Sequence, residues 1–317
     1  MIVFWVGGYM AGKIPVGETI ARAYGFAFGN ILTNIVLIWV PVAILWAITY
    51  FFYIPYVMAN LPTANPEPMM MFSAMRFFFL YGIVMMVLLT AQIAVLTQEA
   101  LGLREGAIFL QFPFGAATWR LLGSFFLFFL VIIVLYIGFF IAGLVGGGIL
   151  GVIASQTGAQ SKLVVGLLVF TLVLSILCAF FYVIVRMSFL LAPVAVAEKR
   201  VSLIRAWQLG QGNFWRMFAI GLSIWIPLIV LEVGFIFWFL GNSFLPPLHG
   251  TPDQIQAFAQ HQQEVSRQMM LQMQSHWYIA YPLSLVVGVI LYGLISGASA
   301  FAYRALVPPD HPVPDAP

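Results

Sequence analysis

The stretch "SFFLFFLVIIVLYIGFFIAGLVGGGIL" at residues 124–150 carries no charged side chain from end to end. A helix needs about 20 apolar residues to cross the roughly 30 Å of a bilayer's hydrocarbon core, and this run is long enough to do so. Its apolar residues are continuous and do not alternate with polar ones, which favours a helix over a strand of a lipid-facing barrel. The run therefore predicts a transmembrane helix.

The rest of the chain has the same character. Hydrophobic residues make up 63% of its 317 positions and charged residues 7%, a composition that a water-soluble globule of this size cannot bury. The sequence thus predicts an all-α integral membrane protein with six transmembrane helices. The six runs lie at about 31–57, 77–97, 124–150, 163–185, 217–241 and 277–303.

The lysines and arginines predict how these helices are oriented, because loops rich in them stay in the cytoplasm. All of the 13 basic residues fall on one side or at its edge except Arg76, Lys162 and Arg267. This asymmetry predicts that both termini are cytoplasmic. The basic residues are spread along one face without a basic tract, so the net charge of +3 predicts no nucleic-acid partner.

The N-terminal segment "MIVFWVGGYMAGK" at residues 1–13 is too short to span and lacks the charged start and cleavage site of a signal peptide. Met1 and Met10 both remain candidate start residues. The C-terminal residues 307–317 form a Pro-rich tail, predicted to be cytoplasmic. The single cysteine, Cys178, lies in an apolar run, so neither a disulfide nor a cysteine-based metal site is predicted.

A short motif occurs three times along the chain. "IARAYGFAFGN" at 20–30 matches "LIRAWQLGQGN" at 203–213, and "PVGETIARAYG" at 15–25 matches "PFGAATWRLLG" at 113–123. Each copy precedes an odd-numbered span, so the chain is predicted to be one transmembrane domain, 1–317, built from three repeats. Each repeat is a short helix followed by a helical hairpin, with units at about 13–98, 113–192 and 194–306.

The short helix of each repeat is predicted to be amphipathic. At 100° per residue, Glu18, Thr19 and Arg22 share one face of the first copy. Such a helix lies in the headgroup plane before the chain turns into the bilayer. At the turns, the pairs Gly29-Asn30 and Gly212-Asn213 predict a glycine bend followed by an asparagine cap.

The repeats place Arg22, Arg120 and Arg205 at equivalent positions. Two interpretations remain open for these arginines. They are either anchors that only set topology, or three sites that hold anionic lipid headgroups, since a guanidinium binds phosphate bidentately. Membrane lipids, anionic ones in particular, are the partners that the second interpretation predicts.

The third copy with its surroundings, "RMSFLLAPVAVAEKRVSLIRAWQLGQGNFWRMF" at 186–218, resembles the membrane domain of the glycerophosphoryl diester phosphodiesterase membrane-domain family. The likeness covers about a tenth of the chain closely and implies a stand-alone multi-pass protein of the bacterial cytoplasmic (inner) membrane. In fused members the catalysis belongs to a soluble barrel, which no segment here is long or polar enough to supply, so that activity is not expected. The residues that carry the resemblance are Arg186, Pro193, Glu198, Arg205, Ala206, Trp207, Gly212, Asn213, Trp215 and Arg216.

The sequence shows no catalytic constellation of its own. Its four histidines all lie outside the predicted spans, and no Gly-rich phosphate loop or metal-binding pair is present. We therefore expect no enzyme activity, no cofactor and no metal. The glycine run "GLVGGGILG" at 143–151 predicts close helix packing through Gly143, Gly147 and Gly151, with a break at 146–148.

Glu232 is the one carboxylate inside a predicted span. An acidic residue there costs roughly 2.5 to 3.5 kcal/mol on insertion scales and is by default a functional candidate. At 1.5 Å per residue it lies about 27 Å from the cytoplasmic start of its helix, within reach of Lys162 or Arg76. It is either paired structurally or handles protons or cations.

Two classes of function remain open. One is a non-catalytic lipid-interacting or scaffold module, and the other is a transporter of a small solute or lipid through the six-helix core. The polar residues of the spans can either line a path or form helix–helix hydrogen bonds. They are Thr33, Asn34, Thr90, Gln92, Thr171, Ser175, Ser284 and Ser296.

Overall fold

The computed structural model describes residues 12–59, 68–104, 114–156, 159–240 and 251–307. Every regular element in these ranges is a helix. In chain order they are α1 (Val16–Gly29), α2 (Ile31–Ile48), the π-helix η1 (Thr49–Tyr53), α3 (Ile54–Ala59), α4 (Pro68–Ala100), α5 (Ala116–Gln156), α6 (Ala159–Ser188), α7 (Leu191–Ala197), α8 (Leu203–Leu209), α9 (Phe214–Leu240), α10 (Pro252–Ser275) and α11 (Trp277–Leu306).

Five helical runs among the described residues are long and apolar enough to cross a bilayer, and a sixth qualifies if α8 and the first part of α9 count as one bent span. The bend between these two helices is 98°. The prediction of an all-α, multi-pass membrane protein is therefore confirmed. The five runs are Ile31–Met58, Phe72–Ala100, Ala116–Gly148, Val164–Ala197 and Trp277–Leu306.

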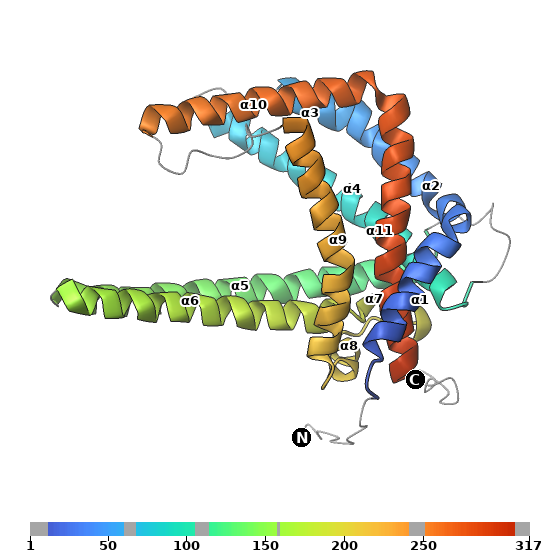
Figure 1. The fold of residues 1–317 in the computed structure, drawn as a ribbon, viewed down its shortest axis with the longest axis horizontal. Coiled ribbons are helices and arrows are strands. Elements are labelled where there is room, and N and C mark those ends of the chain that lie inside the picture. The colour runs from blue at the N-terminus through green and yellow to red at the C-terminus, as the bar shows by residue number, and fades with distance from the viewer. Residues whose placement is uncertain (1–11, 60–67, 105–113, 157–158, 241–250, 308–317) are drawn as a thin grey trace.

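The last helix, α11, is the centre of the bundle. It packs against α1, α2, α4, α7 and α9, and half of its most apolar window is buried. In Figure 1, α10 crosses the upper end of α9 and α11, whereas α1, α7 and α8 gather near their lower end. We call this lower end, where the described chain also begins and ends, the arginine end, because most of the arginines lie there.

The α5–α6 hairpin extends away from the other helices, across the direction of α9 and α11 (Figure 1). The two helices pack on each other, yet the most apolar window of α5 has no buried residue. With 41 residues, α5 is about 60 Å long, twice the thickness of the hydrocarbon core. Its apolar side chains are therefore exposed along most of the helix.

Small residues allow α1 to lie close against α11. A Cβ built on Gly297 would lie 3.1 Å from Cδ1 of Phe26 and 3.4 Å from Cα of Ala23, and one on Gly293 would lie 3.4 Å from Cα of Ala27. Two glycines four residues apart thus meet two alanines four residues apart, which is the small-residue packing typical of membrane helices. This contact draws the N-terminal helix onto the bundle.

The short helix α7 is buried among several other helices at the arginine end. All residues from Leu191 to Val196 are buried, and the helix packs against α4, α5, α8 and α11. Pro193 is its third residue, where the missing N–H costs no intrahelical hydrogen bond. The sequence of α7 is apolar on every side because the helix is enclosed on every side.

The three copies of the repeat motif adopt three different structures. The first is the separate helix α1, and the third is α8 followed by the 98° bend. The second is no separate helix, because residues from Ala116 onward continue directly into α5. The prediction of a turn after each short helix is therefore wrong for the second copy.

Two further details of the motif interpretation are also wrong. Gly212 has a φ of +75°, as the bend requires, but Gly29 is not among the described glycines with positive φ. Asn30 makes no side-chain cap, and the hydrogen bonds of the Asn213 side chain go to residues 12, 14 and 211 instead of α9.

The glycine run of α5 differs from its prediction as well. The helix continues unbroken through 146–148, and a Cβ on Gly143 or Gly147 would meet nothing within 4 Å. The close approach is at Gly146, where a Cβ would lie 2.9 Å from Cδ2 of Leu172 on α6. Gly151 has no described surroundings.

Candidate functional site

The residues that carry the family resemblance gather at the arginine end. They lie on the last turn of α6, on α7, on α8, in the two connections that flank α8, and on the first turn of α9. Their contacts reach α11 and the segment before α1.

Glu198 is a buried carboxylate held by three side chains. Nε of Arg205 donates to one carboxylate oxygen at 3.0 Å, and the hydroxyl of Tyr303 donates to the same oxygen at 3.2 Å. Arg200 donates to the other oxygen, from Nε at 2.8 Å and also from Nη2. The carboxylate side chain is 2% exposed. It therefore ties the connection between α7 and α8 to α11.

Arg186 is buried between two aromatic rings. Its guanidinium carbon lies 3.8 Å from the centroid of the Trp207 ring and 5.7 Å from that of Tyr182. Nε donates to the backbone oxygen of Trp207 at 3.3 Å, and Nη1 donates to the Tyr182 hydroxyl at 2.7 Å. A Cβ on Gly210 would lie 3.2 Å from Cγ of Arg186, so a glycine is needed where α8 ends against α6.

Asn213 and Arg216 hold the segment that precedes α1. The side-chain oxygen of Asn213 accepts from the backbone N–H of Ile14 at 3.1 Å, and its amide donates to the backbone oxygen of Gly12 at 3.1 Å. Nη1 of Arg216 donates to the backbone oxygen of Ile14 at 2.9 Å. Trp215 points outward and is 74% exposed, a position suited to membrane contact.

The three arginines of the repeats occupy unlike surroundings. Arg22 is exposed and pairs with Glu18 one turn away at 2.6 Å. Nη1 of Arg120 donates to the backbone oxygen of Lys199 at 3.4 Å, and Arg205 is engaged by Glu198. Arg120 and Arg205 thus both contact the connection between α7 and α8, through Lys199 and Glu198 respectively. Among the described residues, Arg22 contacts neither of these two. The three arginines therefore differ in their partners.

Arg22 lines a small pocket. This pocket has a volume of about 210 Å³ and lies between α1 and α11. It also brings in the exposed Arg304, whose Nη2 donates to the backbone oxygen of Leu101 at 2.5 Å. We call it the polar pocket; its lining is Pro15, Glu18, Thr19, Arg22, Phe301, Arg304 and Ala305. Sequence reasoning did not connect Arg304 with Arg22.

Two groups can be distinguished among polar residues of the spans. Thr171 and Ser175 are exposed and donate to backbone oxygens of their own helix. Buried side-chain oxygens without a described hydrogen-bond partner occur on three helices that pack together, α2, α4 and α11. We call them the buried oxygens: Asn34 Oδ1, Gln92 Oε1, Thr97 Oγ1 and Ser296 Oγ. Glu232 lies in α9, but its side chain and that of Lys162 are outside the described part of the chain.

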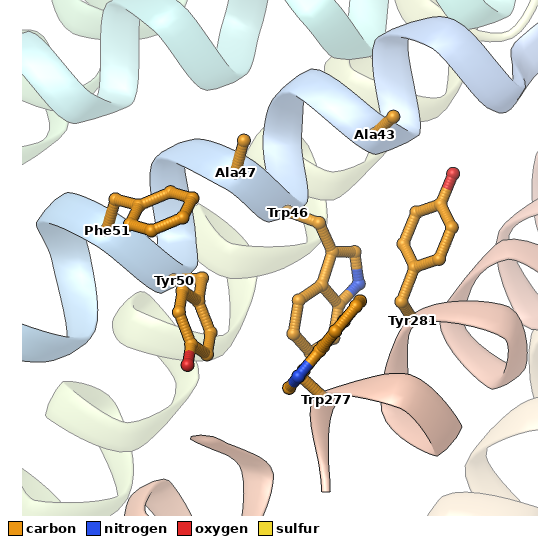
Figure 2. A pocket seen from close by; sticks show the side chains of 7 residues that line it. All are labelled: Ala43, Trp46, Ala47, Tyr50, Phe51, Trp277 and Tyr281. Atoms are coloured by element: carbon orange, nitrogen blue, oxygen red, sulfur yellow. The ribbon is translucent and has the colours of Figure 1, made fainter. Parts of the chain in front are cut away.

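A second, larger pocket lies toward the opposite end of the bundle, between α2–η1 and the first turns of α11. Its volume is about 540 Å³. Figure 2 shows Trp46 and Trp277 at its centre, with Tyr281 on one side and Tyr50 with Phe51 on the other. We call this the aromatic pocket; its lining is Ala43, Trp46, Ala47, Tyr50, Phe51, Trp277 and Tyr281. The sequence interpretation missed it, although five of these residues repeat at helical spacing between 43 and 51.

The described residues contain no group of three or more His, Cys, Asp or Glu side chains placed to hold a metal ion. Both oxygens of the buried Glu198 carboxylate are already hydrogen-bonded. The polar pocket presents guanidinium groups and the aromatic pocket presents apolar and aromatic side chains. Comparison of the chain with protein-family models, curated proteins and solved structures gives no match.

Proposed function

We propose that this multi-pass membrane protein is a lipid-interacting module of the bacterial cytoplasmic membrane, akin to the stand-alone membrane domain that it resembles. In this proposal both termini are cytoplasmic and the chain has no catalytic site of its own. The observation that carries it is the polar pocket, where Arg22 and Arg304 line one small cavity at the arginine end. The lining of the pocket carries two guanidinium groups and one carboxylate, that of Glu18, so its net charge is positive.

The pocket suits the phosphate of a lipid headgroup. Its volume of about 210 Å³ is too small for a whole lipid, and its cationic groups are exposed at the end of the bundle that the basic residues predict to be cytoplasmic. Guanidinium groups bind phosphate through paired hydrogen bonds. Near a membrane surface one such contact contributes about 1 kcal/mol, which corresponds to roughly a fivefold change in affinity.

The test compares Arg22→Gln with Arg267→Gln by native mass spectrometry of the purified chain with phosphatidylglycerol or cardiolipin. Both arginines are exposed and each pairs with a glutamate on its own helix, so the two variants are matched in charge and context. We expect about fivefold weaker retention of anionic lipid in Arg22→Gln at low salt, a difference that shrinks at high salt. Equal retention in the two variants would overturn headgroup binding here.

The absence of catalysis has its own test. The purified full chain, incubated with glycerophosphodiesters, is expected to release no alcohol above the rate of a protein-free sample. Turnover that a point substitution in this chain abolishes would contradict the proposal.

A transporter is the second candidate function, and the buried oxygens favour it. An unsatisfied polar group in a bundle costs about 1–3 kcal/mol, so such groups persist where a bound solute or water completes them. The variant Gln92→Leu separates the alternatives. We expect unchanged or raised thermal stability if the region is only packed, and a clear loss of stability if a polar occupant is held there.

A further inference from the structure

The floor of the aromatic pocket is made of small side chains. Ala43 and Ala47 lie one turn apart on α2, between the larger Trp46, Tyr50 and Phe51 of the same face. Two methyl groups in a row of aromatic rings leave a channel along the helix. Trp277 and Tyr281, also one turn apart, close this channel from α11.

The wall of the pocket is held in place before any ligand arrives. The indole N–H of Trp46 donates to Oγ of Ser284 at 2.5 Å, and Ser284 in turn donates to the backbone oxygen of Tyr281 at 2.8 Å. The rings of Trp46 and Tyr281 meet edge to face with centroids 6.2 Å apart. The two helices are therefore clamped at this depth, and the pocket is not a gap that side chains are free to fill.

The far wall comes from a π-helix. Tyr50 and Phe51 belong to η1, and short π-helical segments are rare and frequent at functional sites. The neighbouring helix α4 fixes this segment, because Tyr81 stacks on Tyr53 with centroids 4.6 Å apart and its hydroxyl lies 3.1 Å from Oγ1 of Thr49. Phe51 is 67% exposed.

The depth of the pocket indicates its occupant. Both helical runs that form it are long and apolar enough to cross a bilayer, and Trp46 lies about 22 Å along α2 from Ile31, which is near the arginine end. The pocket therefore opens to the hydrocarbon close to the opposite membrane face, where ester groups of lipids meet their chains. Figure 2 shows that the hydroxyl of Tyr50 and the indole nitrogen of Trp277 lie on the same side of it.

We infer that the aromatic pocket binds one acyl chain of a membrane phospholipid. The chain lies over Ala43 and Ala47 and against the indole of Trp46, while the polar tips of Tyr50 and Trp277 hydrogen-bond to the ester region. A volume of about 540 Å³ falls in the range of small-molecule pockets and fits one chain in part. The inference rests on the proposed role in lipid binding, but it uses other residues and needs no anionic headgroup.

The experiment uses the full chain in bilayer discs of phosphatidylcholine that contains a photoreactive diazirine in its acyl chain. After irradiation, mass spectrometry of peptides maps the adducts. We expect labelling of 43–51 and 277–281 at least fivefold above that of 134–140 on α5, whose apolar side chains are exposed to the same lipid. Even labelling of the two regions would overturn the inference, and this comparison requires no variant.

A matched pair of variants makes the result specific. Ala47→Trp fills the channel, and Ala179→Trp places the same side chain on the exposed surface of α6. We expect Ala47→Trp to lower labelling of 277–281 at least fivefold and Ala179→Trp to leave it unchanged; equal labelling in both would contradict an occupied channel. Phosphatidylcholine has no net charge and the two pockets share no lining residue. We therefore expect Arg22→Gln to leave this labelling unchanged, so the acyl-chain site and the headgroup site are tested separately.

Discussion

The guanidinium carbon of Arg186 lies 3.8 Å from the centroid of the Trp207 ring, on the first of the two helices that a 98° bend separates. The same arginine donates to the backbone oxygen of Trp207. One side chain of α6 thus holds both the ring and the backbone of α8. Two of the residues that carry the family resemblance therefore have a clear structural role, which is to fix α8 before the chain turns into α9.

Arg186→Lys should destabilise the protein although the charge is kept. A lysine offers neither the planar stacking surface nor two divergent donors, so the contacts with Trp207 and Tyr182 are not replaced. We expect a loss of about 1–2 kcal/mol, visible as a lower midpoint of thermal unfolding in detergent. The control is Arg76→Lys on an exposed position of α4, which should unfold like the parent; an equal midpoint for both variants would contradict this role.

Glu198→Gln should weaken the junction between α7, α8 and α11. The amide keeps the shape but leaves Arg200 and Arg205 without a counter-charge. Losing one partner of a buried ion pair costs about 3–5 kcal/mol, and because these arginines are 43% and 31% exposed, solvent reduces the expected loss to about 1–3 kcal/mol. The matched change Glu264→Gln removes a pair that is half exposed on both sides and should cost less than about 0.5 kcal/mol. Similar unfolding of the two variants would count against the junction.

Gly297→Leu should separate α1 from α11. The new side chain would begin 3.1 Å from Phe26 and 3.4 Å from Ala23, and overpacking of this kind costs typically 1–3 kcal/mol. Limited proteolysis near residue 13 should become faster as α1 detaches. Gly82→Leu is the control, because a Cβ there meets nothing within 4 Å. If cleavage rates stay equal in the two variants, the glycines do not hold α1.

The proposed orientation has a direct test with reporter fusions. Reporters placed after residues 106, 200 and 317 should be active as cytoplasmic markers, and those after 65, 158 and 260 as markers of the outer side. This expectation follows from the excess of Lys and Arg on one side. A reversed result at any of the six positions would refute the six-span topology.

The spans were predictable because their signal is local. A continuous apolar run indicates a membrane helix whatever the rest of the chain does, and the run from residue 277 matches α11 closely. The repeat motif was less informative, since the same pattern around Arg22 and Arg120 gives a separate helix in one copy and the start of α5 in another. A short motif specifies a helical face, but the packing of neighbouring helices decides where the helix ends.

The candidate sites required information that no local pattern contains. The aromatic pocket depends on Trp46 facing Ser284 across 238 positions of sequence, and Glu198 finds Tyr303 across 105. One signal was nevertheless present in the sequence: Gly293 and Gly297 have the four-residue spacing that predicts close helix contact. The prediction was instead made for Gly143 and Gly147, which have the same spacing but where a Cβ would meet nothing within 4 Å.

Because Ala23 of α1 packs against Gly297 of α11, the helix bundle cannot be completed until α11 has been synthesised. At 5–20 residues per second, a ribosome makes α11 roughly 14–55 s after α1. During that interval α1 lacks the helix that buries its small residues. The helices α2 and α4 also lack their contacts with α11. The bundle can close only when the last segment has been inserted, so a nascent chain halted before α11 should be recognised as incomplete by the membrane's quality-control proteases.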